Sequence, residues 1–486
     1  MTPTAPSSVP SSPALSAALS AAVSPAPTRP GPDRSRLPVV VIGAGPIGLA
    51  AAAHLLERGL EPVVLERGPS AGSAVRSWGH VRLFSAWSEL VDPAARRVLE
   101  PTGWVHPDAN EYPLGRDWVE RYLEPLAAVL GERIRYNATV IGASRRGRDV
   151  MVDSGRADQP LTVHMQRADG SRERMAARGL VDASGTYRSP SPLGSDGYPA
   201  AGEAAHAERI SHRIPDLTQD QERGLYAGQL TAVVGSGHSA LTALVALAEL
   251  AREAPGTRAV WVLRRGAVGN TFGGGEADQL PARGALGLRA KAAIAAGDID
   301  VIRGFRTAEV QTHDGRLVLV ADDGRRLEGI DRVVGLTGFR PDHTITSELR
   351  LNLDPRLGAP VKLAPLIDPN IHSCGTVYPH GAAELAHEEQ DVFVVGMKSY
   401  GRAPTFLAMT GYEQVRSVAA ALAGDLESAA RVELTLPETG VCGGAGLFDS
   451  AESSAESQAA GSGGCCGGPG VLQIGTGIPV AVASSC

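Results

Sequence analysis

The sequence predicts an α/β fold with two Rossmann-like, three-layer dinucleotide-binding domains and small β-meanders, the first domain being interrupted by the second. Three observations predict this class. A β-branched run, a glycine turn, an Ala/Leu-rich helical pattern and a second apolar run occur in this order twice. Each copy continues into alternating runs separated by Asp-Gly pairs, which are typical of β-hairpins. Each copy then closes on a similar segment, LVDASGTYRSP from Leu180 and VVGLTGFRPD from Val333.

Both ends of the chain differ in composition from its middle. Residues 1–36 are mostly Ser, Pro, Ala and Thr, and residues 437–486 return to Gly, Ser and Ala without a sustained period. Such segments bury too little apolar surface to offset the entropy of ordering. We therefore expect a disordered lead, a folded middle and a flexible tail.

The composition limits the class of protein. A chain of 486 residues, 43% hydrophobic and 20% charged, exceeds one ordinary core and is typical of globular domains. The formal net charge of −7 argues against nucleic acid as a partner. No run reaches the roughly 18 apolar residues of a membrane span, and the start lacks the charged region of a secretory signal. We expect a cytoplasmic protein that binds no membrane, and its five cysteines predict no disulfide framework.

The first glycine motif is GAGPIG, which follows the first β-branched run. Gly43 permits a tight turn, Gly45 lets the backbone approach a pyrophosphate, and Gly48 lets helix and strand pack closely. Glu66 ends the next apolar run, where a carboxylate accepts hydrogen bonds from ribose hydroxyls, although a surface glutamate is the alternative. The residues expected to contact this dinucleotide are Gly43, Gly45, Pro46, Ile47, Gly48, Glu66 and Arg67.

The second motif is GSGHSA, with alanine in the last position, which the dinucleotide fingerprint tolerates. Where the first copy has Glu66, the second has Arg264 and Arg265. A guanidinium binds a 2′-phosphate that a carboxylate would repel, so the pair favours NADPH over NADH, with a solvated turn as the alternative. We expect His238 to pack beside the pyrophosphate without a chemical role. The expected contacts are Gly235, Gly237, His238, Ser239, Ala240, Arg264 and Arg265.

From about Leu37 to Gly424, these motifs and the segments DASGTY and LTGFRPD resemble the class B flavin monooxygenase superfamily and the related thioredoxin-reductase-like enzymes. The resemblance implies FAD on the first fold and NADPH on the second, with the two segments crossing between them. The implied divisions are a disordered lead at 1–36, a first FAD-binding segment at 37–195, the NADPH-binding domain at 196–330, a second FAD-binding segment at 331–436 and the tail at 437–486.

The chain also departs from both branches of this superfamily. The segment 200–206 keeps the glycine and histidine spacing of the monooxygenase linker pattern but lacks its aromatic residues, and Ile210 stands at the following aromatic position. This departure puts classical amine or Baeyer-Villiger oxygenation in doubt. Gly396 is expected at the FAD site, but Met397 replaces the aspartate of the disulfide reductases. No redox pair of cysteines follows the first motif.

Three segments show a closer resemblance. WGHVRLFSAW, APLIDPNIHSCGTVYPHG and GMKSYGRAPTFLAMTGYEQVRS look like bacterial flavin-binding monooxygenases encoded beside arsenic-resistance genes. The resemblance implies that NADPH reduces the flavin, that a C4a-peroxyflavin forms with dioxygen, and that one oxygen passes to a soft small-molecule nucleophile. The substrate and the oligomeric state stay open, with a homodimer among the alternatives. No metal-binding spacing occurs.

Two other functions compete with monooxygenation. An NADPH-dependent thiol or metalloid reductase would use soft thiolates, such as the vicinal pair Cys465 and Cys466 in the tail. Cys374 precedes the last expected flavin-contacting unit and is the one catalytic candidate, with a structural cysteine as its alternative. A non-catalytic flavin redox sensor is the third function, and the intact second nucleotide motif argues against it.

Two further features have open roles. The glycine run at 269–276 is interpreted either as a mobile cover over the nicotinamide or substrate, or as an ordinary surface loop. The aromatic group Trp78, Phe84, Trp87 and Trp104 is interpreted as core packing in preference to a substrate pocket.

Overall fold

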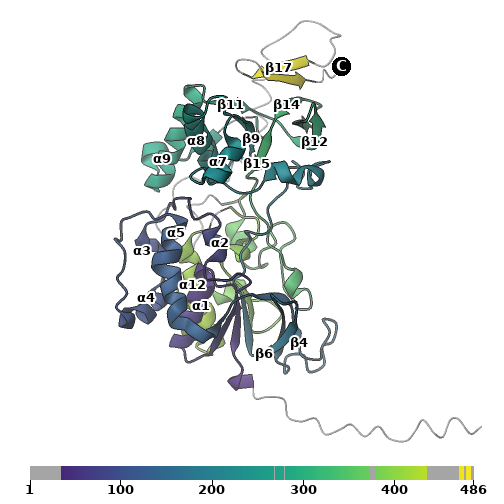
Figure 1. Ribbon diagram of the computed structural model, residues 1–486. Helices are drawn as coiled ribbons and strands as arrows, with labels where there is room; N and C mark the ends of the chain where they lie inside the picture. The colour runs from purple at the N-terminus through teal and green to yellow at the C-terminus, as the bar shows by residue number, and fades with distance from the viewer. Residues whose placement is uncertain are drawn as a thin grey trace, which may run out of the picture.

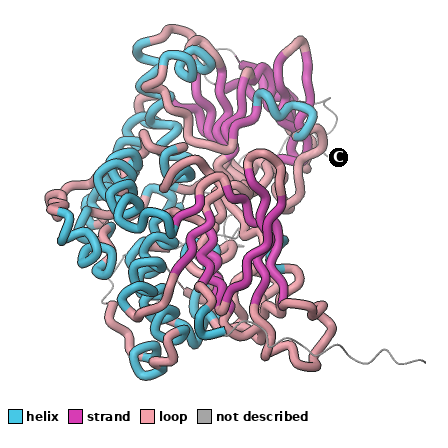
Figure 2. The backbone as a smooth tube through the Cα atoms, turned by 60° about the horizontal axis from the view of Figure 1, so that its bottom comes forward, coloured by secondary structure: helices cyan, strands magenta, loops and turns pink. Residues whose placement is uncertain are grey.

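The computed structural model describes residues 34–266, 269–278, 280–372, 379–404, 406–434, 470–474 and 478–482. The described chain forms two α/β units, which lie one above the other and are joined by extended segments (Figure 1). Each unit has a parallel sheet with helices against one face and antiparallel strands against the other (Figure 2). The α/β class with two Rossmann-like, three-layer units is thus confirmed.

The lower unit is built on a five-stranded parallel sheet in the order β16-β7-β1-β2-β3. Its central strands are the β-branched run at 39–42 and the apolar runs at 62–65 and 179–182. Residues buried on both faces of a sheet favour parallel strands. The strands are β1 (Val39–Ile42), β2 (Pro62–Leu65), β3 (Ile134–Arg135), β7 (Gly179–Asp182) and β16 (Val392–Val394).

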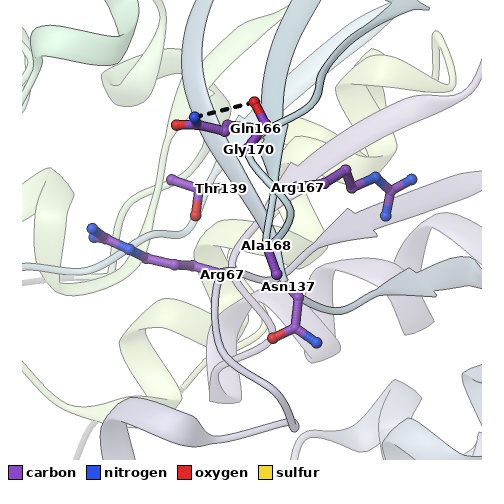
Figure 3. Close-up of a pocket in the computed structure, with 7 residues that line it drawn as sticks. All are labelled: Arg67, Asn137, Thr139, Gln166, Arg167, Ala168 and Gly170. Atoms are coloured by element: carbon purple, nitrogen blue, oxygen red, sulfur yellow. Dashed lines mark hydrogen bonds between the residues drawn. The ribbon is translucent and has the colours of Figure 1, made fainter.

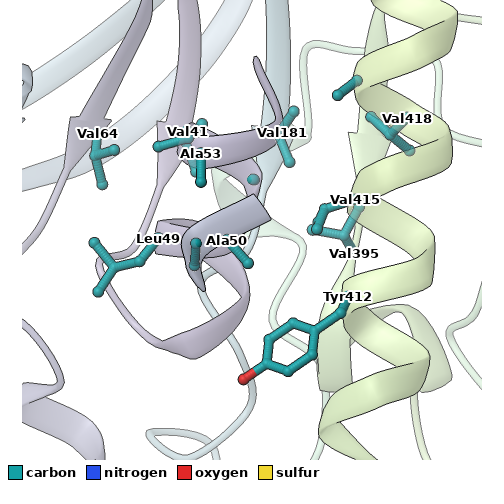
Figure 4. Packing of buried hydrophobic residues seen from close by; sticks show 14 of the residues in the cluster. Val41, Leu49, Ala50, Ala53, Val64, Val181, Val395, Tyr412, Val415 and Val418 are labelled. Atoms are coloured by element: carbon teal, nitrogen blue, oxygen red, sulfur yellow. The ribbon is translucent and has the colours of Figure 1, made fainter. Parts of the chain in front are cut away.

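Alternation along β1 divides the core of this unit. Val39 and Val41 point to the helices α1 (Pro46–Glu57) and α12 (Ala408–Leu422), which pack on one another. Figure 4 shows this packing, with Leu49 and Ala53 of α1 and Val415 of α12 near Val41. Val40 and Ile42 point to the opposite face, as period-two alternation requires. That face is covered by β4 (Ala138–Arg145), β5 (Leu161–Arg167) and β6 (Arg172–Ala177).

The upper unit repeats this arrangement with the sheet order β11-β10-β9-β15-β8. Its strands are β8 (Ile210–Ser211), β9 (Leu230–Val234), β10 (Arg258–Val262), β11 (Ile299–Ile302) and β15 (Arg332–Gly335). Val233 and Trp261 pack against the helices α8 (His238–Glu253) and α9 (Pro281–Ala295). Ala232 and Val260 face the meander of β12 (Thr307–His313), β13 (Arg316–Ala321) and β14 (Arg326–Ile330). The hairpins expected at all three Asp-Gly pairs are confirmed.

The remaining helices mostly cover the lower unit. Asp92 caps α4 by accepting a hydrogen bond from the Ala95 N–H, as a good N-cap residue does. The elements are α2 (Ser73–Arg76), α3 (Trp87–Leu90), α4 (Pro93–Leu99), α5 (Gly115–Trp118), a π-helix (Val119–Leu123), α6 (Glu124–Leu130), α7 (Asp220–Tyr226), α10 (Ala364–Ile367), α11 (Ala382–Leu385) and α13 (Leu426–Ala430). Within the described residues, no helix is long and apolar enough to cross a membrane.

The two units are joined where residues 189–191, which follow DASGTY, run antiparallel to residues 338–340 of LTGFRPD. The Ser191 N–H donates to the Gly338 carbonyl at 2.8 Å, and the Arg340 N–H donates to the Ser189 carbonyl at 2.8 Å. Pro190 forms the bridge with Phe339 between these two bonds. This two-stranded connection fits the crossing between the two folds that the resemblance implies.

Short segments with regular secondary structure lie within both expected chain ends. Arg34–Arg36, which we assigned to the disordered lead, form a 3-10 turn, and the Arg34 guanidinium donates to Asp391 at 2.5 Å. In the expected flexible tail, β17 (Gly470–Ile474) and β18 (Ile478–Val482) form a hairpin, and β18 pairs with β14. Apolar and β-branched residues in 470–474 and 478–482 favour strands, and the edge of β14 offers hydrogen bonds to β18.

Three of the four aromatic residues lie in or against the core of the lower unit. Trp87 is completely buried there, and Trp78 and Trp104 are half-buried against the same cluster. Phe84 instead packs against the helical core of the upper unit, so it bridges the two units. Core packing is thus confirmed for Trp87.

A half-buried histidine makes stability depend on pH. Burial lowers the pKa of His387 to about 4, and its Nδ1 accepts the Asn352 N–H at 3.2 Å. Because an unfolded histidine has a pKa of about 6.5, the unfolded chain binds the extra proton between these values. The contribution of neutral His387 to the free energy of unfolding is therefore complete above about pH 6.5. It is lost as the pH falls towards 4, and the loss amounts to at most about 3 kcal/mol.

We expect His387→Gln, which keeps an acceptor for Asn352, to reduce this pH dependence. Urea unfolding at about pH 7.5 and about pH 5 should show a smaller loss for the variant than for the wild type. Equal losses in both proteins would contradict the assignment.

Candidate dinucleotide sites

The first glycine turn lies between β1 and α1 at the carboxyl edge of the lower sheet. Gly43 has φ +98°, and a Cβ there would lie 2.9 Å from the Ala183 carbonyl oxygen. A Cβ on Gly48 would lie 1.9 Å from the Gly43 oxygen, so both positions need glycine. A Cβ on Gly45 meets no heavy atom of the described chain within 4 Å. The turn therefore leaves open space beside Gly45, where the motif requires close approach of a ligand.

Glu66 lies beside this open space. Its Oε2 accepts the Ala44 N–H at 2.7 Å, and its Oε1 accepts the Gly68 N–H at 2.6 Å. The carboxylate thus reaches the glycine turn from the end of β2. This placement fits a group that binds ribose hydroxyls next to the N-terminus of α1, where free N–H groups favour a diphosphate.

Residues from the other end of the chain complete the same site. Gly396 has φ +69°, and a Cβ there would lie 3.2 Å from Ile47 Cγ1. The Gly396 N–H donates to Gln414 Oε1 of α12 at 2.7 Å. Pro46 stands at the first position of α1, where its missing N–H costs nothing. The structure therefore brings Gly396 against the glycine turn.

Arg67 follows Glu66 and lines a shallow pocket of about 270 Å³. Figure 3 shows Arg67 and Thr139 on one side of this pocket, with Gln166 above them. The pocket lies on the meander side of the sheet and is open to solvent. Its lining residues are Arg67, Asn137, Thr139, Gln166, Arg167, Ala168 and Gly170.

The second glycine turn repeats the geometry of the first. Gly235 has φ +136°, and a Cβ there would lie 2.2 Å from the Leu336 carbonyl oxygen. Trp261 Nε1 donates to the Gly235 carbonyl at 2.7 Å and fixes the turn to β10. Ala240 is fully buried in the helical core. Gly237 resembles Gly45, because nothing in the described chain lies within 4 Å of its added Cβ.

The expected nucleotide-selecting residues follow β10. The Arg264 side chain is exposed, and its guanidinium donates to the Ser195 carbonyl at 3.1 Å. Arg265 is half-buried, and its carbonyl accepts the Gly304 N–H at 2.7 Å. Ser239 is exposed in the first turn of α8. The exposed cation of Arg264 lies on the same sheet edge as the glycine turn and fits a phosphate-binding role.

His238 packs as an uncharged ring. Its ring lies edge-on to Phe84 with 5.5 Å between centroids. Burial, aided by the nearby Arg283 cation, lowers the pKa of His238. A neutral imidazole in van der Waals contact fits the packing role expected for this residue.

The glycine-rich segment after β10 is held by a buried ion pair that we did not predict from the sequence. Asp278 and Arg283 form a buried ion pair at 2.7 Å, and Asp278 Oδ2 accepts the Gly274 N–H at 2.9 Å. Gly269–Phe272 and Gly275–Ala277 are 3-10 turns held against α9 by this pair. One signal could have indicated this ion pair, namely an aspartate five residues before an arginine at the start of a helical run.

The cysteine hypotheses lie outside the described residues. Cys374, Cys465 and Cys466 all fall in segments that the structure does not describe. Within the described ranges, no cluster of at least three His, Cys, Asp or Glu residues is suited to a metal ion.

The fold and the two glycine turns define a class, the oxidoreductases with two dinucleotide-binding units. Residues 40–361 match the Pyridine nucleotide-disulphide oxidoreductase family. The chain belongs to this family and is an oxidoreductase enzyme.

Relatives of two kinds resemble the chain. Indole-3-pyruvate monooxygenase YUCCA1 of Oryza sativa subsp. japonica is 33% identical over 206 residues, which are 42% of this chain and 43% of the relative. The thiamine thiazole synthase of Archaeoglobus fulgidus is 29% identical over 205 residues, which are 40% of this chain and 76% of the relative. The match to the plant relative thus spans less than half of its length.

Solved structures share the fold at low identity. The bacillithiol disulfide reductase Bdr of Bacillus cereus superposes with a TM-score of 0.57 at 19% identity, covering 80% of this chain and 99% of that one. The FAD-bound cadaverine monooxygenase DfoA of Erwinia amylovora has a TM-score of 0.55 at 16% identity, covering 82% and 98%. Monooxygenases and disulfide reductases thus share this architecture.

Proposed function

We propose that the protein is an FAD- and NADPH-dependent oxidoreductase of the flavin monooxygenase type. The single observation that carries the proposal is the pair of glycine turns with opposite charges beside them. Glu66 lies beside the turn at Gly45, whereas the exposed Arg264 follows the strand beside the turn at Gly237. FAD would be held by 37–195 and 331–436, and NADPH by 196–330.

The chain's own residues bind and orient the two dinucleotides. The N–H groups at the start of α1 and α8 would bind the diphosphates, Glu66 would accept hydrogen bonds from a ribose, and Arg264 would donate to the 2′-phosphate. The redox chemistry, hydride acceptance and activation of dioxygen, belongs to FAD when it is bound. Overall, one NADPH, one proton and one dioxygen convert the substrate to its oxygenated product, with water and NADP⁺.

The substrate class rests on the sequence resemblance. We infer a soft small-molecule nucleophile, and the segments WGHVRLFSAW and GMKSYGRAPTF support a trivalent organoarsenical. The plant monooxygenase that is 33% identical over part of the chain supports oxygenation as the reaction. A cytoplasmic location and the oligomeric state stay predictions.

The deciding experiment combines anaerobic reduction with labelled oxygen. Purified, FAD-loaded protein is reduced with NADPH or NADH and then mixed with ¹⁸O₂ and a trivalent organoarsenical. We expect reduction to prefer NADPH and the product to carry ¹⁸O. Complete conversion of oxygen to hydrogen peroxide, whatever nucleophile is supplied, would contradict a monooxygenase.

A thiol or metalloid reductase is the second candidate, favoured by the fold shared with Bdr. It requires thiols, so Cys374→Ser and the double variant Cys465→Ser/Cys466→Ser should abolish reduction of a disulfide or metalloid by NADPH. Unchanged NADPH oxidation in these variants, with ¹⁸O in the product, would exclude it. Failure of NADPH to reduce the flavin would favour the redox sensor.

Arg264→Ala should reduce the preference for NADPH. Because a hydrogen bond to a charged group is worth about 1.5–3 kcal/mol, the loss in kcat/KM with NADPH should be about tenfold or more, with NADH little changed. Steady-state kinetics with both donors measure this ratio. Arg289→Ala is the matched control, because it removes an exposed ion pair between Arg289 of α9 and Glu249 of α8, and it should leave the ratio unchanged.

A further inference from the structure

A buried ion pair lies behind the first glycine turn, and neither the motifs nor the proposed chemistry uses it. Lys398 Nζ lies 2.6 Å from Asp182 Oδ2, and the two side chains are 1% and 0% exposed. Asp182 ends β7, and Lys398 lies in the 3-10 turn Gly396–Tyr400 after β16. The pair therefore joins two neighbouring strands at the carboxyl edge of the sheet, where ligands of parallel sheets bind.

Both charges converge on one exposed residue, Ser184. The Ser184 Oγ donates to Asp182 Oδ1 at 2.6 Å, and it accepts a hydrogen bond from Lys398 Nζ at 3.1 Å. The Ser184 N–H donates to the same Asp182 oxygen at 3.1 Å. One backbone and two side-chain hydrogen bonds therefore hold Ser184, although the residue is exposed to solvent.

Ser184 forms one wall of the glycine turn. A Cβ on Gly43 would lie 2.9 Å from the Ala183 oxygen and 3.3 Å from Ser184 Cα, so the 183–184 backbone touches the turn. On the same side, Gly396 packs against Ile47, which follows the open position Gly45 by two residues. The ion pair thus links the ends of β7 and β16, and the 183–184 backbone that follows β7 contacts the glycine turn after β1.

Stability alone does not account for the pair. Taking two charges out of water costs about as much as their attraction returns, and well-packed apolar residues of similar size are often equally or more stabilising. Core positions between β7 and β16 could therefore be filled by leucine and methionine. An apolar pair would lose the hydrogen bonds that Asp182 and Lys398 make with Ser184.

We propose that Lys398 and Asp182 are positioning residues for FAD, acting through Ser184. This inference rests on the proposed function, because it concerns the same first dinucleotide site. The ion pair holds the 183–185 backbone against the Gly43 turn, so that Ser184 and the N–H groups of the turn present one preformed surface to the cofactor. Preformed surfaces bind more tightly because less ordering occurs on binding.

The test separates folding from cofactor binding. Lys398→Met alone leaves a buried carboxylate unpaired and should lower the melting temperature and the FAD affinity together. The double variant Asp182→Leu/Lys398→Met should melt near the wild-type temperature yet bind FAD about tenfold more weakly, because the contacts to Ser184 are gone. Fluorescence titration of apoprotein with FAD measures Kd, and visible circular dichroism reports the seating of the bound flavin, which should also change.

Glu389→Gln is the matched control. Glu389 is 3% exposed and pairs with the buried Arg145 of β4 at 2.6 Å, away from the glycine turn. This variant should lower the melting temperature while leaving the FAD Kd and the flavin dichroism unchanged. Ser184→Ala is the second variant, since an exposed hydroxyl is dispensable for folding, and it should weaken FAD binding severalfold.

The outcomes distinguish the two proposals. Wild-type affinity and dichroism in the double variant or in Ser184→Ala, with FAD bound by the wild type, would overturn the positioning role alone. Weaker FAD binding in Glu389→Gln, matched to its lower stability, would also overturn it. A wild-type chain that binds no FAD would instead overturn the proposed function.

Discussion

Gly45→Asp is expected to yield a folded protein that no longer binds FAD. An added side chain at Gly45 meets no described atom within 4 Å, and φ is −82°, so the backbone tolerates a larger residue. The new carboxylate would occupy the open space where the diphosphate is expected. Juxtaposed like charges cost several kcal/mol, so FAD affinity should fall by about 100-fold or more.

The measurement is FAD titration of the apoprotein together with thermal unfolding. Gly224→Asp is the matched control, because this glycine of α7 also has no described atom within 4 Å of its added Cβ. The control should bind FAD normally. Gly45→Asp protein that unfolds at the wild-type temperature and still binds FAD tightly would show that the first turn is not the FAD site.

The sequence predicted both glycine turns because the local geometry there needs particular residues. A positive φ and a carbonyl oxygen within 3 Å leave only glycine at Gly43 and Gly235, so the motif marks the turns directly. The segments that close the two copies meet the turns at equivalent positions. The Ala183 and Leu336 oxygens, which approach the two glycines, lie at matching places in DASG and LTG.

Groups that meet across long separations could not be predicted. Asp182 and Lys398 lie 216 positions apart, and neither stands in a pattern that marks burial. Their meeting depends on β16 pairing with β7, which brings a late strand of the chain beside an early one. Likewise, the packing of Phe84 against the upper unit depends on how the units lie together, and no single-sequence period carries that information.

The hairpin of β17 and β18 could not be predicted from composition for a different reason. Composition over the whole segment 437–486 favours disorder, because Gly, Ser and Ala dominate it. Within it, two short stretches rich in apolar residues form β17 and β18, and the partner strand β14 lies far upstream. When composition is averaged over the whole segment, the few residues of this hairpin have little effect on the result.

Gly237→Asp is expected to separate the two dinucleotides, because it makes the same change at the second turn. Gly237 has φ −85°, and its added side chain likewise meets only open space in the described chain. FAD should stay bound with an unchanged Kd, since Gly237 lies in the upper unit. The rate of flavin reduction at low NADPH should fall by about 100-fold or more, from repulsion of the NADPH diphosphate.

Anaerobic stopped-flow reduction of the FAD-loaded variant measures this rate, and reduction by dithionite checks that the flavin itself is intact. Together with Gly45→Asp, the variant forms a reciprocal pair in which each carboxylate removes one dinucleotide and spares the other. Loss of FAD from Gly237→Asp, or normal reduction by NADPH, would show that the second turn does not bind the hydride donor. Because the two turns have similar backbone geometry, we expect the groups beside them, Glu66 and Arg264, to decide which dinucleotide each one takes.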